Sequence, residues 1–174
     1  MAETFEEYVG RIESYVKGRN PMRILRETPR RLARRVAGAP RRSLTAPPAP
    51  GKWSAGQILA HLSEIELLWG YRVRTMLERD DPELVGMDQD VWARAGRYER
   101  RDPAESLALF TALRRSHVEL LSALTPKELA RAGKHSHFGR LTIARIVRLL
   151  AGHDVNHGRQ IDAILKAKSS RARR

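Results

Sequence analysis

The sequence contains no cysteine, few aromatic residues and no long hydrophobic run. Without thiols the chain cannot form disulfides, iron–sulfur clusters or thiolate zinc sites, so a transition-metal site would need His, Asp or Glu ligands. The aromatic share of 6% argues against a β-sandwich. The first residues, MAETFEEYVG, lack the basic and apolar parts of a signal peptide, and no segment approaches the length of a membrane span. We therefore expect a cytoplasmic protein that does not enter a membrane.

Positive charge is abundant: 6 lysines and 27 arginines make up the 33 basic residues, and the formal net charge is +13. Such an excess raises the question of nucleic-acid binding. The basic residues are scattered, however, and their local clusters at 29–35, 41–42 and 166–174 contain no aromatic residues on which bases could stack. We therefore expect no specific nucleic-acid partner.

The length of 174 residues suits one domain with a sizeable core. We assign residues 1–174 to a single helical domain, with its core at about 22–166 and a basic, disordered tail at 167–174.

Apolar residues recur at helical spacing in several segments, and no segment alternates as a strand does. Ser54 with Gln57 forms a capping box, and Asp102 with Pro103 marks another helix start. We predict helices at 4–18, 22–37 (disturbed at Pro29), 55–79, 103–124 and 141–166, short helical pieces at 89–95 and 125–128, and loops at 39–52 and elsewhere in 80–101. The pattern predicts an all-α fold, a four-helix bundle with long connections and extra short helices.

Histidines lie on the apolar faces of two of these predicted helices. His153 and His157 are four residues apart, one turn, so their side chains share one face with Ile146, Leu150 and Ile161. His61 lies on the apolar stripe of the helix at 55–79. Three imidazoles could therefore converge inside the bundle, where they would repel when protonated and leave lone pairs unused when neutral.

A divalent metal ion would resolve both problems. Three neutral histidines that leave one position open are typical of a catalytic metal site, because the open position admits water or substrate. The spacing alone also fits ordinary core histidines with single hydrogen-bond partners, as we expect for His117.

Three segments resemble the DinB-like superfamily. Residues 50–72, PGKWSAGQILAHLSEIELLWGYR, resemble its Trp-Ser and Ala-His-Leu signature, and residues 151–161, AGHDVNHGRQI, resemble its closing His-Asp-x-Asn-His-x-x-Gln-Ile motif. MDQDVW at 87–92 is similar to a further family segment, and the resemblance extends from about residue 22 to 165. The family's usual HPExG appears as HSHFG at 135–139, so His137 stands where Glu is common.

This resemblance implies a four-helix bundle in which His61, His153 and His157 hold a nickel, zinc, iron or manganese ion. The superfamily includes metal-dependent hydrolases and thiol-dependent S-transferases of the bacillithiol and mycothiol type. The resemblance also implies a small-molecule substrate and a homodimer. A thiol would have to come from a low-molecular-weight cosubstrate, because the chain has none.

Further residues are candidates for the surroundings of the metal. Asp154 and Asn156 flank the histidine pair and could orient the imidazoles or cap loops. Four more candidates for the pocket come from loops and from the connection at 80–101: Asp90, Trp92, His135 and His137. We name no catalytic group beyond the water or thiol that the metal would bind.

Two functions remain as hypotheses. The first is a divalent-metal-dependent enzyme, a thiol S-transferase or a hydrolase, whose three-histidine centre activates a small thiol or water. The second is a non-catalytic stress-response or ligand-binding bundle with a structural metal. The sequence alone leaves open whether the protein is an enzyme.

Overall fold

The computed structural model describes the backbone of residues 3–172 and the side chains of residues 3–167. The helices are α1 (Phe5–Ser14), α2 (Pro21–Val36), α3 (Arg41–Thr45), α4 (Ala55–Glu78), α5 (Gln89–Ala95), the 3-10 turn η1 (Tyr98–Arg100), α6 (Pro103–Ala123), α7 (Pro126–Leu129) and α8 (Ile143–Ala172). The strands are β1 (Glu83–Leu84), β2 (Ala132–His135) and β3 (Gly139–Thr142).

Polar caps set the starts of the main helices. Ser54 caps α4 in a capping box with Gln57, as predicted, and Asp102 caps α6 ahead of Pro103. Asn20 caps α2, again ahead of a proline in the first turn. These caps accept N–H groups that have no partner within the helix, so each helix begins where the chain supplies a suitable side chain.

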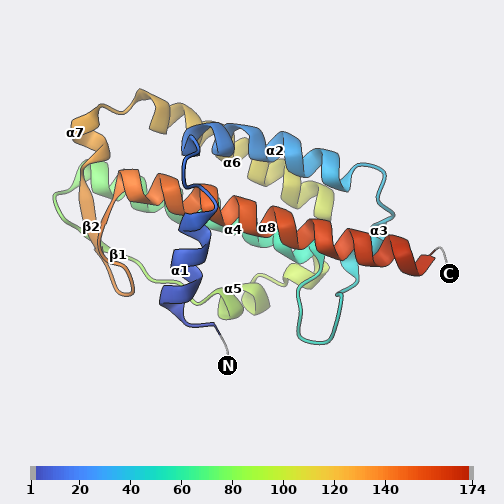
Figure 1. Cartoon of the computed structure of the whole chain (residues 1–174). Coiled ribbons are helices and arrows are strands. Elements are labelled where there is room, and N and C mark those ends of the chain that lie inside the picture. The colour runs from blue at the N-terminus through green and yellow to red at the C-terminus, as the bar shows by residue number, and fades with distance from the viewer. Residues whose placement is uncertain (1–2, 173–174) are drawn as a thin grey trace.

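Four long helices, α2, α4, α6 and α8, form the bundle (Figure 1). Both α2 and α4 pack against α6 and α8, which closes a ring of four helices around one interior. The short helix α1 crosses α8 on the outside (Figure 1). This architecture confirms the predicted all-α, four-helix fold class.

Among the described residues, two large apolar clusters fill the interior of the bundle. One contains Ile65 and Trp69 of α4 together with Leu150 of α8, and the other contains Leu62 of α4 and Ile161 of α8. Buried polar residues occupy the levels between these clusters: Thr28, His61, Glu66, Arg114, His117, Asp154, Asn156 and His157. The fold therefore places a polar layer across its own core.

A small sheet beside α7 departs from the prediction of a loop there (Figure 1). β2 pairs antiparallel with β3, from Ala132 opposite Thr142 to His135 opposite Gly139, and β1 adds in parallel to β2. Strands of two and four residues are too short to show alternation, and the pairing of β1 with β2 is non-local, so no local pattern indicates these strands.

Two further boundaries differ from those predicted. The loop predicted at 39–52 contains α3, a single turn. The last helix, α8, continues to Ala172, past the predicted end at about residue 166; residues 173–174 of the predicted disordered tail lie outside the described residues.

Candidate metal centre

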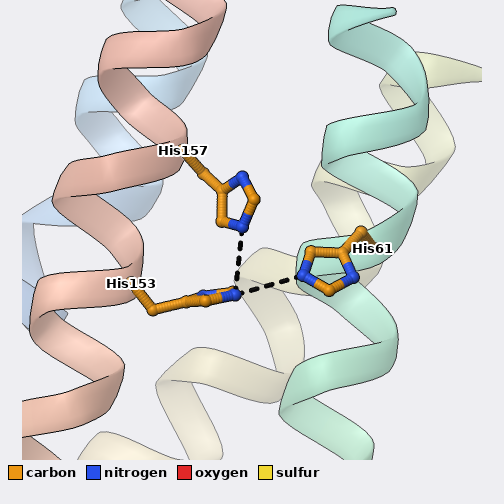
Figure 2. Close-up of side chains that lie close together, drawn as sticks. All are labelled: His61, His153 and His157. Carbon is orange, nitrogen blue, oxygen red and sulfur yellow. Dashed lines mark hydrogen bonds between the residues drawn. The ribbon is translucent and has the colours of Figure 1, made fainter. Parts of the chain in front are cut away.

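His61 on α4 and His153 and His157 on α8 converge inside the bundle (Figure 2). The Nε2 atom of His153 lies 3.1 Å from Nε2 of His61 and 3.0 Å from Nε2 of His157. We call these three residues the histidine triad. His61 and His157 are 2% and 7% exposed, and the ring of Trp53 covers His61 at a centroid distance of 5.0 Å.

The triad is neutral at physiological pH. Burial lowers the pKa of His61 and His153 well below its usual value, and the charge of neighbouring imidazoles lowers it further. Burial also lowers the pKa of His157 to about 4. All three rings are therefore available as neutral nitrogen ligands.

Hydrogen bonds alone do not satisfy this arrangement. A neutral imidazole nitrogen carries either one proton or one lone pair, so Nε2 of His153 cannot bond well to two other Nε2 atoms. Nitrogens that share a tetrahedral zinc ion are separated by about 3.3 Å, given bonds of about 2.0 to 2.1 Å. The two separations from His153 are close to that value, and all three ligand nitrogens lie within 4.8 Å of one another, so the three residues fit a divalent ion.

Gln160 fixes the orientation of one ring. His157 donates from Nδ1 to Oε1 of Gln160 at 2.8 Å, which places the lone pair of His157 on Nε2, toward the centre of the triad. Among the described residues, Nδ1 of His61 and Nδ1 of His153 have no hydrogen-bond partner. Gln160 was missed as a site residue, although its position three residues after His157 on a helix places both side chains on one face.

A cavity of about 870 Å³ opens onto the triad. Its walls come from α1, α4, α5, α8 and the β2–β3 hairpin, and its apolar lining includes Ile65, Leu68, Leu149 and Leu150. This volume falls in the range of sites for small molecules.

The predicted pocket residues divide between this cavity and other surroundings. Asp90, His135, His137 and Asn156 line the cavity. Asn156 accepts a hydrogen bond at 2.6 Å from Arg11 of α1 rather than from an imidazole. Trp92 is half-buried on α5, and Asp154 lies deeper in the bundle; neither is among the residues that line the cavity.

The family model of the DinB superfamily matches residues 24–161, a range that includes the whole triad. The chain belongs to the DinB superfamily. This DinB-superfamily protein is 26% identical over 145 residues to a protein of Oceanobacillus iheyensis named "Putative metal-dependent hydrolase", with 83% of each chain covered. It is 25% identical over 137 residues to YfiT of Bacillus subtilis, which has the same descriptive name; the match covers 78% of this chain and 77% of YfiT.

The fold also matches a solved structure of this group. The structure of Bacillus subtilis YfiT, described as "a probable metal-dependent hydrolase with an unusual four-helix bundle topology", superposes with a TM-score of 0.79 and 23% identity over 86% of each chain. In the described part of the DinB-superfamily protein, no helix combines the length and apolarity needed to cross a membrane.

Beneath the triad, the DinB bundle holds a buried ionic cluster. Arg114 of α6 donates to Glu66 of α4 at 2.7 Å and to Asp154 of α8 at 3.0 Å. His117 bonds to the other oxygen of Glu66 at 2.8 Å, which makes it a core histidine, as expected, rather than a member of the triad. Asp154 thus anchors the helix turn that carries His153, but it bonds to an arginine and not to the ring.

Proposed function

We propose that this protein is a divalent-metal-dependent enzyme in which His61, His153 and His157 hold the ion through their Nε2 atoms. The observation that carries this proposal is the convergence of three neutral Nε2 atoms beside a cavity that has room for a substrate. The names of the relatives from Oceanobacillus iheyensis and Bacillus subtilis support the same chemistry.

When bound, the ion would act as a Lewis acid that lowers the pKa of a water or a thiol and so provides a nucleophile near neutral pH. The protein's own residues do the rest. Three ligands from the chain leave a position open, whereas a structural site is normally closed by a fourth protein ligand. Trp53 and the apolar cavity wall exclude bulk water around the triad, and Gln160 holds the ring of His157 in place.

Two reactions fit this site: hydrolysis, in which water attacks the substrate, and transfer of a small thiol. The names of the relatives favour hydrolysis. Thiol transfer is favoured by the scarcity of carboxylates that could act as the general base for water. The described carboxylates that line the cavity are Glu3, which is paired with Arg11 at 2.6 Å, and Asp90, which is exposed on α5. The chain has no cysteine, so the thiol would be a low-molecular-weight cosubstrate.

Elemental analysis tests the metal centre directly. We expect about one divalent ion per chain in the wild-type protein purified without an affinity tag, and a loss of that ion in the variant with both His153→Ala and His157→Ala. His137→Ala is the matched control, because His137 lines the same cavity but lies outside the triad. Absence of metal from the wild-type protein would refute the proposal.

Turnover then separates the reactions. An electrophilic ester or epoxide is incubated with the metal-loaded protein, with and without an added thiol, and the products are identified by mass spectrometry. A hydrolase gives the diol from the epoxide or the acid and alcohol from the ester in both cases. A transferase gives the thioether from the epoxide, or the thioester and alcohol from the ester, only with thiol. Full metal occupancy without turnover of any substrate would instead favour the non-catalytic binding bundle. Cytoplasmic location, homodimerisation and a role in stress response remain predictions.

A further inference from the structure

Arg72 lines the same cavity as the triad and lies on α4, the helix that carries His61. It follows His61 by eleven residues on α4, which is about three helical turns, so the two side chains share one face. Ile65, Leu68 and Trp69 lie between them and line the same cavity. The cavity therefore follows one face of α4, over about 16 Å of helix at about 1.5 Å per residue, from the triad to Arg72.

The guanidinium of Arg72 is buried without a counter-charge. The residue is 3% exposed, and among the described residues no carboxylate forms an ion pair with it. Burial lowers its pKa to about 10, so it still carries its charge at neutral pH. One edge of the guanidinium, Nε and Nη2, donates to the carbonyl oxygen of Val85. The opposite edge, formed by Nη1 and the second N–H of Nη2, has no described protein acceptor.

His135 offers a second donor at this end of the cavity. Its Nδ1 accepts the backbone N–H of His137 at 3.1 Å, so the neutral ring has its proton on Nε2. The residue is 7% exposed, lines the cavity, and its ring stacks with Trp69 at an interplanar angle of 15°. Arg72 lies over the same indole, with Cζ 4.4 Å from the ring centroid. The indole ring of Trp69 thus neighbours both donors.

We propose that Arg72 and His135 form a subsite for a carboxylate of the substrate, at the end of the cavity remote from the triad. An uncompensated buried cation costs free energy that an anionic ligand group would recover. The free edge of a guanidinium matches the two oxygens of a carboxylate. One arginine and one neutral imidazole suit a singly charged carboxylate better than a phosphate dianion.

The proposal defines the shape of the substrate. Its carboxylate lies at Arg72, its middle is apolar to match Ile65, Leu68 and Leu149, and its reacting group reaches the triad. This last point rests on the proposed function, whereas the carboxylate subsite itself does not. The other described charges that line the cavity are Lys52, Asp90 and the paired Glu3 and Arg11.

Binding of straight-chain probes tests the subsite. Octanoate and methyl octanoate are titrated into the full metal-loaded chain, with calorimetry and tryptophan fluorescence as readouts. We expect octanoate to bind at least tenfold more tightly than its ester, and Arg72→Gln to reduce octanoate affinity at least tenfold. His135→Gln should reduce it severalfold. Arg74→Gln is the matched control, because Arg74 is on the same helix, bonds to Gly70 and does not line the cavity.

Three outcomes would overturn the proposal: equal binding of acid and ester, no binding of octanoate, or unchanged octanoate affinity in a folded Arg72→Gln variant. If loss of the bond to Val85 unfolds that variant, the comparison of acid with ester decides, made in the variant with both His153→Ala and His157→Ala, in which no metal ion competes for the carboxylate. The variant with both His153→Ala and His157→Ala separates this proposal from the metal centre. Octanoate should still bind to it even though the metal is lost, so either proposal can fail alone.

Discussion

The carboxylate of Asp154 binds Arg114 through both of its oxygens, directly beside the triad residue His153. Arg114 also binds Glu66 and is 2% exposed, so one cation and two anions from three helices share the core. A carbonyl from the fourth helix completes the cluster. Leu25 of α2 accepts from Nη1 of Arg114 at 3.3 Å, and Pro29, four residues later, has no N–H with which to occupy that carbonyl.

Arg114→Met should therefore be strongly destabilising. Removal of the cation leaves two buried carboxylates without their partner, and the expected loss in the free energy of unfolding is about 3 to 5 kcal/mol. Denaturant titration followed by circular dichroism measures it. Arg23→Met is the control, because Arg23 pairs with Glu27 on the exposed face of α2, where water screens the pair, and the substitution should leave stability nearly unchanged. Similar losses in both variants would show that the buried cluster contributes no more than a surface pair.

Gly152→Ala should displace α1 from the bundle. A Cβ atom at Gly152 would lie 2.1 Å from the carbonyl oxygen of Ile12, which belongs to the backbone of α1 and cannot move independently. We expect a net destabilisation of about 1 to 3 kcal/mol, measured by thermal or denaturant unfolding.

The control is Gly10→Ala within α1, where an added Cβ meets nothing within 4 Å. That change should stabilise the protein by about 0.5 to 1 kcal/mol, because alanine favours the helix. Stabilisation by both substitutions would contradict the close approach of α1 to α8.

Much of the bundle was predictable because its signals are local. Capping residues such as Ser54 and Asp102 and the apolar stripes fixed the positions of α4, α6 and α8 to within a few residues, apart from the end of α8. The convergence of the triad was also predictable, since each histidine lies on an apolar helix face. Pro29 was expected to disturb its helix. Instead, α2 continues through Pro29, and the carbonyl oxygen of Leu25 accepts a hydrogen bond from Arg114 rather than from a helix N–H.

The unpredicted features depend on distant segments. Burial of Arg114 requires partners from three other helices, and no spacing within α6 indicates them. The β1–β2 pairing likewise joins residues about fifty positions apart through two-residue and four-residue strands. Arg72 was one arginine among 27, and its isolation from carboxylates becomes visible only once the cavity is built.

Gln160→Ala should weaken the metal centre without removing a ligand. Gln160 accepts the Nδ1 proton of His157, and loss of such a partner typically lowers metal affinity by about 10- to 100-fold. Competition with a chromophoric zinc chelator measures the affinity. Gln89→Ala serves as the control, since Gln89 lines the cavity but has no described bond to the triad. Equal zinc affinity in the Gln160 variant and the wild type would mean that packing alone orients His157.

His135 should make stability depend on pH. Burial, the charge of Arg72 and the neighbouring His137 lower the pKa of His135 from about 6.5 to about 4, and in the unfolded chain the pKa returns to its ordinary value. Between these two values the unfolded state takes up a proton that the folded state does not, so unfolding becomes more favourable as the pH falls. The contribution of His135 is therefore constant above pH 6.5 and is lost progressively from pH 6.5 to about 4.

His135→Gln should flatten this part of the pH profile, measured as the free energy of unfolding from pH 4 to 8 at fixed metal content. The exposed neighbour His137 provides the comparison. His137→Gln removes the neighbour's smaller effect on the pKa of His135 but keeps the buried imidazole and Arg72, so most of the slope should persist. If both variants kept the full wild-type slope, the acid sensitivity would come from other groups, and the imidazole of His135 would be solvated like that of an ordinary surface histidine.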